Sequence, residues 1–288
     1  MTAPLLPPEL LERLARLQLG TRRRLGGSFT GDHTSRQRGT SLDFADYREY
    51  HPGDDFRRID YNLLARLDQL VVKLFESDDD LTVRLLVDTS ASMALHGKLR
   101  CASQVAAVFG FVSLLRRDVV ELWSFPDGPP RRRFRGHGGS GALFDALSSL
   151  QPGGHTDVPA AAGALLAGRG VAGCTILVSD LLTPDWEPAL RRLPSRGDDL
   201  LVVHVVAIPD IEPELVGDLD LVDVETGARV AVSLSADARR HYRRHAEAWI
   251  DRVRAATMRS GAGYVRVDPA DPVDATLVAA WQRQGALR

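Results

Sequence analysis

Apolar and polar residues along this chain follow two repeats. Short continuous apolar runs, rich in Val, Ile and Leu, are typical of strands in a parallel sheet that is covered on both faces. Apolar residues spaced three or four apart are typical of helices that pack one face on a core. The predicted strands span residues 70–75, 81–88, 119–125, 175–180, 200–207 and 264–267. The predicted helices span residues 7–19, 98–116, 141–150, 158–166, 188–193, 236–260 and 272–284.

This order of elements predicts an α/β fold. Strands that alternate with helices build a doubly wound, mainly parallel sheet with helices on both faces. Two further runs, 219–224 and 229–234, are joined by Glu225-Thr226-Gly227, which predicts a β-hairpin inserted into the alternating pattern. We expect an N-terminal extension over residues 1–77 and the α/β domain over residues 78–288. Ligands of such a sheet bind at the carboxyl ends of its strands.

One predicted strand leads directly into a group of oxygen-bearing side chains. The apolar residues 85–87 are followed by Asp88, and Ser90 and Ser92 come after it at alternate positions. In a loop that leaves a strand, this spacing can turn three oxygens toward one point, and hard cations such as magnesium prefer oxygen ligands. The competing interpretation is that Ser90 or Ser92 caps the helix that follows. One cap needs one hydroxyl, and this loop offers three, so the metal site is favoured.

The segment DTSAS followed by Met93 resembles the D-x-S-x-S opening of the metal-ion-dependent adhesion site (MIDAS) of von Willebrand factor A domains. Such domains complete the site with a threonine in a glycine-rich loop and an aspartate at the end of a later strand. Thr156 in GGHTD and Asp180 at the end of CTILVSD are the candidates, in the same order. The resemblance therefore implies a von Willebrand factor A-like, Rossmann-like fold with a MIDAS. Its predicted metal-binding residues are Asp88, Ser90, Ser92, Thr156 and Asp180.

The same resemblance implies how the site works. It implies that the hydroxyls of Ser90, Ser92 and Thr156 bind Mg²⁺ directly, with Mn²⁺ or Ca²⁺ as alternatives to Mg²⁺. Asp88 and Asp180 then act directly or through water. The remaining coordination position is left for an aspartate or glutamate of a partner protein, so that the metal forms a bridge between two proteins.

A second resemblance covers the N-terminal third of the chain. The stretch from His33 through SRQRGTSLDFADYREYHPGDDFRRIDYNLLARLDQLVVKLFE resembles the signature of the bacterial domain-of-unknown-function family fifty-eight. Tyr61 stands where the signature has tryptophan, and Asp43-Phe44 stands where it has Glu-Phe. Members of this family resemble partners of MoxR-type AAA+ ATPases, which implies a role in remodelling or maturation of client proteins. The chain has no phosphate-binding GxxxxGK[ST] pattern, so we expect a partner to be the ATPase.

The expected function is thus a non-enzymatic, Mg²⁺-dependent protein–protein interaction module that works as an adaptor. The alternative is a magnesium-assisted phosphoryl-transfer enzyme in which Asp88 is the nucleophile. Phosphatases of the haloacid dehalogenase type place a second aspartate two residues after the nucleophile, where this chain has Ser90. The general acid of that mechanism is therefore missing, and we expect no enzyme.

Composition narrows the remaining classes. Apolar residues make up 44% of the chain and charged residues 26%, as in an ordinary globular protein, and the net charge of −2 argues against a general nucleic-acid or membrane-surface binder. Residues 1–40 are basic, but without interleaved aromatic residues we interpret them as a solvated arm rather than as an RNA-binding or acidic-partner surface. We find no apolar run of membrane-spanning length and no basic region before the first apolar residues. With only Cys101 and Cys174, both in apolar patterns, we expect a cytoplasmic protein without disulfides.

Overall fold

The computed structural model describes residues 4–20, 42–49, 71–77, 81–126, 131–168 and 173–288. The chain forms two compact units, one made of residues 1–21 with 81–288 and the other of residues 22–80. In the second unit, β1 (Leu42–Glu49) and β2 (Val71–Ser77) pair in antiparallel fashion. The predicted strand at 70–75 thus lies largely within β2, while β1 falls in a segment whose alternating charges gave no strand prediction. The rest of the family signature segment lies outside the described residues.

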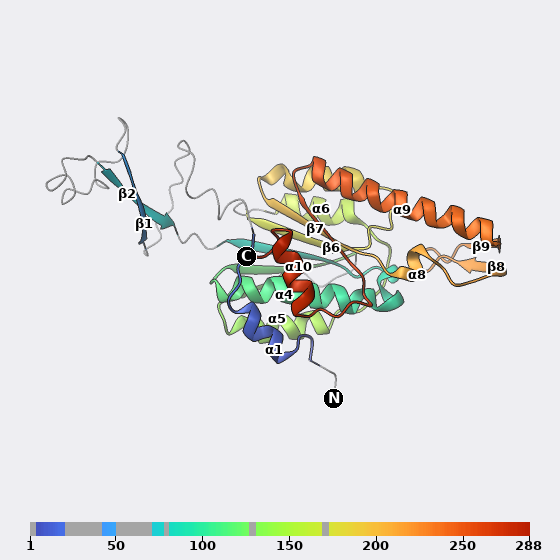
Figure 1. The fold of residues 1–288 in the computed structure, drawn as a ribbon, viewed down its shortest axis with the longest axis horizontal. Helices are drawn as coiled ribbons and strands as arrows, with labels where there is room; N and C mark the ends of the chain where they lie inside the picture. The colour runs from blue at the N-terminus through green and yellow to red at the C-terminus, as the bar shows by residue number, and fades with distance from the viewer. Residues whose placement is uncertain (1–3, 21–41, 50–70, 78–80, 127–130, 169–172) are drawn as a thin grey trace. The chain divides into compact units, whose positions relative to one another are not determined.

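The larger unit is built on a six-stranded sheet in the order β10-β7-β6-β3-β4-β5 (Figure 1). Five strands are parallel, and the edge strand β5 runs antiparallel to β4. The strands are β3 (Thr82–Asp88), β4 (Val119–Phe125), β5 (Arg132–Arg135), β6 (Cys174–Ser179), β7 (Asp199–Val205) and β10 (Gly263–Val267). The predicted α/β class with a mainly parallel sheet is therefore confirmed.

Helices cover both faces of this sheet (Figure 1). Along β3, Leu85 and Val87 belong to one apolar cluster and Leu86 belongs to the other, as expected for side chains that alternate between faces. The first cluster includes residues of α1 (Pro8–Leu14), α4 (Lys98–Leu115), α5 (Gly139–Ser148) and α10 (Ala275–Arg283). The second includes residues of α6 (Val158–Ala167), α7 (Trp186–Arg192) and α9 (Ala236–Arg259). Ser235 caps α9, accepting a hydrogen bond from the Ala238 amide at 3.2 Å.

The remaining elements are short helical segments and a hairpin that is not part of the central sheet. A short helix, α8 (Ile208–Ile211), follows β7, and the predicted hairpin consists of β8 (Gly217–Val222) and β9 (Arg229–Leu234). Two 3-10 segments, η2 (Ala91–Gly97) and η3 (Leu193–Arg196), precede α4 and β7.

Helix α4 is the central helix of the first layer. Its side chains are buried almost all round, and a Cβ atom added at Gly110 would meet Leu143 at 2.5 Å and Leu85 at 3.2 Å. The glycine therefore allows α4 to approach both α5 and the sheet closely. Among the described residues, the segment Ala91–Leu115 is the single helical stretch long and apolar enough to span a membrane. As 78% of that window is buried inside the unit, the burial is that of a core helix.

A buried ion pair joins three strands at the end of the sheet opposite the carboxyl ends. The guanidinium of Arg84 in β3 lies 3.0 Å from Asp198, just before β7, and 3.7 Å from Glu121 in β4. Asp198 also accepts hydrogen bonds from the Gly173 amide and the Thr175 hydroxyl, at 2.6 and 3.0 Å. This network fixes how β3, β4, β6 and β7 line up.

We predict that Arg84→Ala lowers the free energy of unfolding by about 3 to 5 kcal/mol, because it removes the guanidinium that lies 3.0 Å from the buried Asp198 carboxylate. Urea denaturation of both proteins measures the loss. The control is Arg191→Ala, which removes an exposed ion pair with Glu187 of 2.9 Å and should cost no more than about 1 kcal/mol. Equal losses in the two variants would contradict the structural role of the buried network.

Candidate functional site

The strand order creates a natural place for a site. Numbered along the chain, the six strands read 3-2-1-4-5-6 across the sheet, which is the doubly wound order with a switch point between the first and the fourth strand. Those two strands are β3 and β6. Asp88 is the last residue of β3, and Asp180 directly follows β6, so both predicted aspartates lie at the switch point.

Asp88 is a fully buried carboxylate, and among the described residues the groups that contact its two oxygens are hydrogen-bond donors. One of its oxygens accepts from the Ser90 amide at 2.9 Å, and the other accepts from the Ser179 hydroxyl at 2.5 Å. Burial above all, and then the charge of Asp180, raise the pKa of Asp88 to about 7, against the smaller opposite effect of these hydrogen bonds. The carboxylate therefore lies where a positive charge would stabilise it.

The segment after β3 that contains Ser90 and Ser92, called the serine loop below, places two hydroxyls beside Asp88. The Ser90 and Ser92 hydroxyl oxygens are 3.0 Å apart, and both residues are buried. Ser90 occupies the N-cap position of η2 but makes no side-chain capping bond there, so helix capping does not account for its hydroxyl. The loop ends in strained backbone, since His96 has a φ of 53°.

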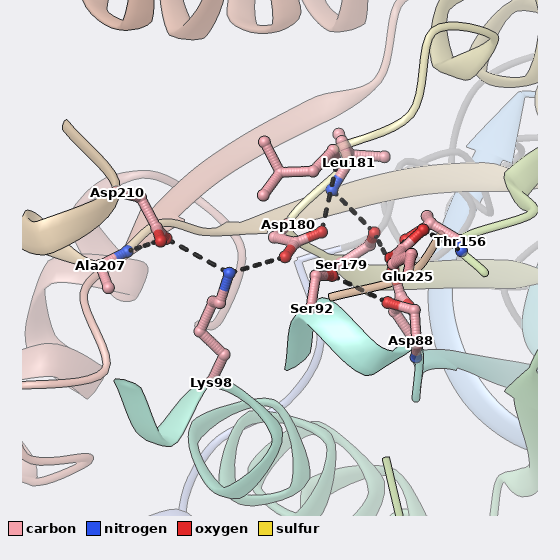
Figure 2. Close-up of polar contacts among 12 residues, drawn as sticks. Asp88, Ser92, Lys98, Thr156, Ser179, Asp180, Leu181, Ala207, Asp210 and Glu225 are labelled. Atoms are coloured by element: carbon pink, nitrogen blue, oxygen red, sulfur yellow. Dashed lines mark hydrogen bonds and ion pairs between the residues drawn. The ribbon is translucent and has the colours of Figure 1, made fainter. Parts of the chain in front are cut away.

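The Thr156 loop is fastened to the serine loop by two backbone hydrogen bonds. The Gly153 amide donates to the Thr89 carbonyl at 2.7 Å, and the Ala91 amide donates to the Gly154 carbonyl at 3.0 Å. Capping of α6 falls to the next residue, Asp157, so Thr156 is not needed for it. The Thr156 hydroxyl and amide instead donate to the two carboxylate oxygens of Glu225, at 2.7 and 3.0 Å (Figure 2).

Asp180 differs from Asp88 in having a cation of its own. Its Oδ2 lies 2.8 Å from the ammonium of Lys98, a fully buried lysine that also lies 3.3 Å from Asp210 (Figure 2). The other oxygen, Oδ1, accepts from the Leu182 amide at 3.2 Å. Leu181 between them has a φ of 55°, a left-handed conformation that costs a β-carbon residue about 1 to 2 kcal/mol. Backbone strain of this kind is common at functional sites.

A neutral histidine, His204, contacts the backbone carbonyl of Asp180. His204 Nε2 lies 3.1 Å from the Asp180 carbonyl, which can only accept, so Nε2 carries the proton and Nδ1 accepts from the Tyr264 hydroxyl at 3.0 Å. Burial lowers the pKa of His204 to about 3, which keeps the ring neutral. His204 therefore positions the end of β6 and supplies no charge to the site.

The five predicted residues thus lie at the carboxyl ends of the central strands β3 and β6 and in the loops beside them. Asp88, Ser90 and Ser92 form a direct hydrogen-bonded group, the Thr156 loop is bonded to their loop, and Asp180 acts on Asp88 through its charge. The sequence did not indicate Ser179, Lys98, Glu225 or His204. Lys98 left a weak signal, since it is one of two lysines in the chain and adjoins an apolar helix.

The donor set fits a hard cation in its chemistry, since it consists of hydroxyl and carboxylate oxygens. Among the described residues there is no group of three or more His, Cys, Asp and Glu that could hold a metal, so a cation here would depend on the hydroxyls. Lys98 already engages one oxygen of Asp180, which leaves that aspartate its other oxygen or a bridging water. Beside Asp180 and Asp210 opens a mainly apolar pocket of about 350 Å³, lined by residues such as Tyr242, Trp249 and Ile250.

Similar proteins have been described without an assigned function. Over 251 residues the chain is 29% identical to the uncharacterized protein Mb1516 of Mycobacterium bovis and, equally, to the uncharacterized protein Rv1480 of Mycobacterium tuberculosis. Each alignment covers 84% of this chain and 79% of the relative.

Two solved structures also match. One is the conserved hypothetical protein BatB of Bacteroides thetaiotaomicron, with 15% identity, a TM-score of 0.41 and coverage of 71% of this chain and 96% of that one. The other is an aerotolerance-related membrane protein of Bacteroides fragilis, with 17% identity, a TM-score of 0.42 and coverage of 71% and 98%. The predicted cytoplasmic location is wrong on this comparison, because that protein is described as a membrane protein, and we withdraw it.

The predicted family is confirmed. The model of the family described as "Protein of unknown function DUF58" matches residues 46–251, which include β3, the serine loop, Thr156, Asp180 and the hairpin turn at Glu225. This chain is a member of the DUF58 family.

Proposed function

We propose that this DUF58 protein is a non-enzymatic, Mg²⁺-dependent protein–protein interaction module of the von Willebrand factor A type. The metal-binding residues in this proposal are Asp88, Ser90, Ser92, Thr156 and Asp180. A divalent cation held by them would offset the carboxylate charges and offer a coordination position to an acidic side chain of another protein. The proposed partners are a MoxR-type AAA+ ATPase and a client protein that supplies an Asp or Glu.

The observation that carries this proposal is the state of Asp88. It is a fully buried carboxylate with raised pKa, and the groups around it are hydroxyls and an amide. A structural aspartate in such a place is usually paired with a buried cation, as Asp180 is with Lys98. Strained backbone at Leu181, whose amide donates to the Ser179 hydroxyl at 2.9 Å, adds support.

Each supporting residue has a defined task in the proposal. Ser179 donates to Asp88 and leaves its other oxygen facing the serine loop, where the Ser90 amide holds it. His204 holds the Asp180 carbonyl, and Lys98 reduces the negative charge of the Asp180 carboxylate. The net negative charge of the site would therefore be smaller than that of two unpaired aspartates, because Lys98 pairs with Asp180.

The alternative of a phosphoryl-transfer enzyme gains no support from this geometry. The position two residues after Asp88 carries the Ser90 hydroxyl, which contacts Ser92, and a hydroxyl is a poor general acid near neutral pH. We therefore do not propose catalysis by Asp88.

We predict that Mg²⁺ raises the thermal unfolding temperature of the wild-type protein, because a ligand that binds only the folded state stabilises it by about 2.7 kcal/mol at a hundredfold excess over Kd. Differential scanning fluorimetry with millimolar Mg²⁺ or with EDTA measures the shift. Ser92→Ala should lose most of it. The matched control is Ser103→Ala, another buried serine, whose hydroxyl donates to the Leu147 carbonyl away from the site. An equal Mg²⁺ shift in Ser92→Ala and in Ser103→Ala would overturn the proposed ligand set.

We predict a pH dependence of stability in EDTA that originates at Asp88. Its folded pKa of about 7 lies above the ordinary value of 3.8, so the folded state keeps a proton that the unfolded state releases. The stabilisation is complete below about pH 4 and is lost as the pH rises through about 7, with a slope of at most about 1.4 kcal/mol per pH unit. Urea denaturation between pH 4 and pH 8 measures it, and Asp88→Asn, which carries no titrating group, is the reference. A wild-type curve parallel to that of Asp88→Asn would contradict the prediction.

We predict that the tagged protein recovers a MoxR-type AAA+ ATPase from a detergent-solubilised lysate in Mg²⁺ and not in EDTA. Mass spectrometry identifies the ATPase, and Asp88→Ala should abolish the recovery because it removes a metal-binding carboxylate. Arg191→Ala on the exposed surface of α7 should bind as the wild type does. Recovery that is the same with and without the metal, and in Asp88→Ala, would exclude a metal-dependent partnership.

A further inference from the structure

Glu225 is an acidic side chain that the chain itself brings to the candidate site. Its carboxylate accepts from both the hydroxyl and the amide of Thr156, and its side chain is only 14% exposed although it belongs to a hairpin turn. The exposed His155 lies close to this carboxylate, with its Nδ1 4.0 Å from Glu225 Oε2. A carboxylate that two donors of one residue hold at the proposed site is placed like a ligand and not like a solvated surface acid.

The turn that carries Glu225 is built to present it. Asp223 accepts from the amides of Glu225 and Thr226, at 2.8 and 3.2 Å, and the Gly227 amide donates to the Asp223 carbonyl at 2.8 Å. Gly227 has a φ of 71°, which a side chain would strain. The position of the Glu225 backbone is thus set by the turn, and its side chain extends from there to Thr156 (Figure 2).

The hairpin as a whole is weakly held. Most residues of β8 and β9 are exposed, including Leu221, Val222 and Val230, so little apolar area is buried when the hairpin rests on the rest of the unit. Elements with little burial open at low free-energy cost. The contact between Glu225 and Thr156 therefore joins the buried candidate site to a hairpin that can open locally.

We propose that Glu225 is the chain's own ligand for the position that a partner's acidic side chain takes in the proposed metal site. The inference rests on the proposed function and deepens it. With cation bound, Glu225 completes the coordination from within the molecule, and a partner's aspartate or glutamate binds only after the hairpin has moved. Because Glu225 is tethered to the site through the hairpin, the effective local concentration of its carboxylate is in the millimolar range. It therefore excludes weak acidic ligands, and only a partner that makes further contacts can replace it.

The test compares Mg²⁺ binding by the wild type, Glu225→Ala and Asp220→Ala. Asp220 is the matched control, because it is an acid of the same hairpin that pairs with the exposed Arg229 at 3.1 Å. Isothermal titration should give a Kd for Mg²⁺ in Glu225→Ala that is weaker by on the order of tenfold or more, as losses around metal ligands usually are. Asp220→Ala should keep the wild-type Kd.

Acetate then serves as a small stand-in for the partner's carboxylate. In the presence of Mg²⁺, acetate should raise the unfolding temperature of Glu225→Ala more than chloride of equal ionic strength does. It should have no such effect on the wild type, where Glu225 occupies the position, or on Glu225→Ala combined with Ser92→Ala.

The outcomes separate the two proposals. Absence of Mg²⁺ binding in the wild type would remove the proposed function and this inference with it. Mg²⁺ binding in the wild type with an unchanged or tighter Kd in Glu225→Ala, or with no acetate rescue, would overturn the inference alone and leave the proposed function in place.

Discussion

Two carboxylates stand at the ends of neighbouring parallel strands in a buried sheet, and the cost of burying their negative charge is the constraint around which this end of the sheet is arranged. Burial raises the pKa of Asp88 most, and the negative charge of Asp180 raises it further. The chain compensates the two acids unequally. Asp180 has the buried ammonium of Lys98, whereas Asp88, within the described part of the chain, is held by hydrogen bonds and has a pKa raised to about 7. Asp88, beside the hydroxyls of the serine loop, is therefore the carboxylate that a bound cation would stabilise.

The surrounding frame keeps that point in place. Buried apolar strands on both sides of β3 fix the ends from which Asp88 and Asp180 start, and the Arg84 network fixes their alignment at the opposite end. Backbone hydrogen bonds then connect the serine loop to the Thr156 loop, and His204 holds the carbonyl of Asp180. In this arrangement the strand ends and their loops carry the oxygens, while the exposed hairpin carries an acid, Glu225, that reaches Thr156.

The sequence predicted the parts of this picture that depend on local pattern. Continuous apolar runs marked the central strands, the Glu225-Thr226-Gly227 turn marked the hairpin, and the alternate spacing of Asp88, Ser90 and Ser92 marked the serine loop. The sequence did not predict the contacts that depend on tertiary folding. Lys98 is 82 residues from Asp180 along the chain and Glu225 is 69 residues from Thr156, so no spacing rule joins either pair. Strand β1 was missed because its alternating charges carry no apolar repeat.

The double ion pair of Lys98 ties the chemistry of the switch point to the wall of the adjoining pocket. One ammonium serves both Asp180 and Asp210, and Asp210 belongs to the short helix α8 that borders the pocket with Tyr242. Any displacement of α8 that draws Asp210 away leaves the whole positive charge to Asp180, and any displacement toward the lysine withdraws part of it. Asp180 and Asp210 share the Lys98 ammonium as their counter-ion. The electrostatic potential near Asp88 therefore depends on the position of α8, which carries Asp210.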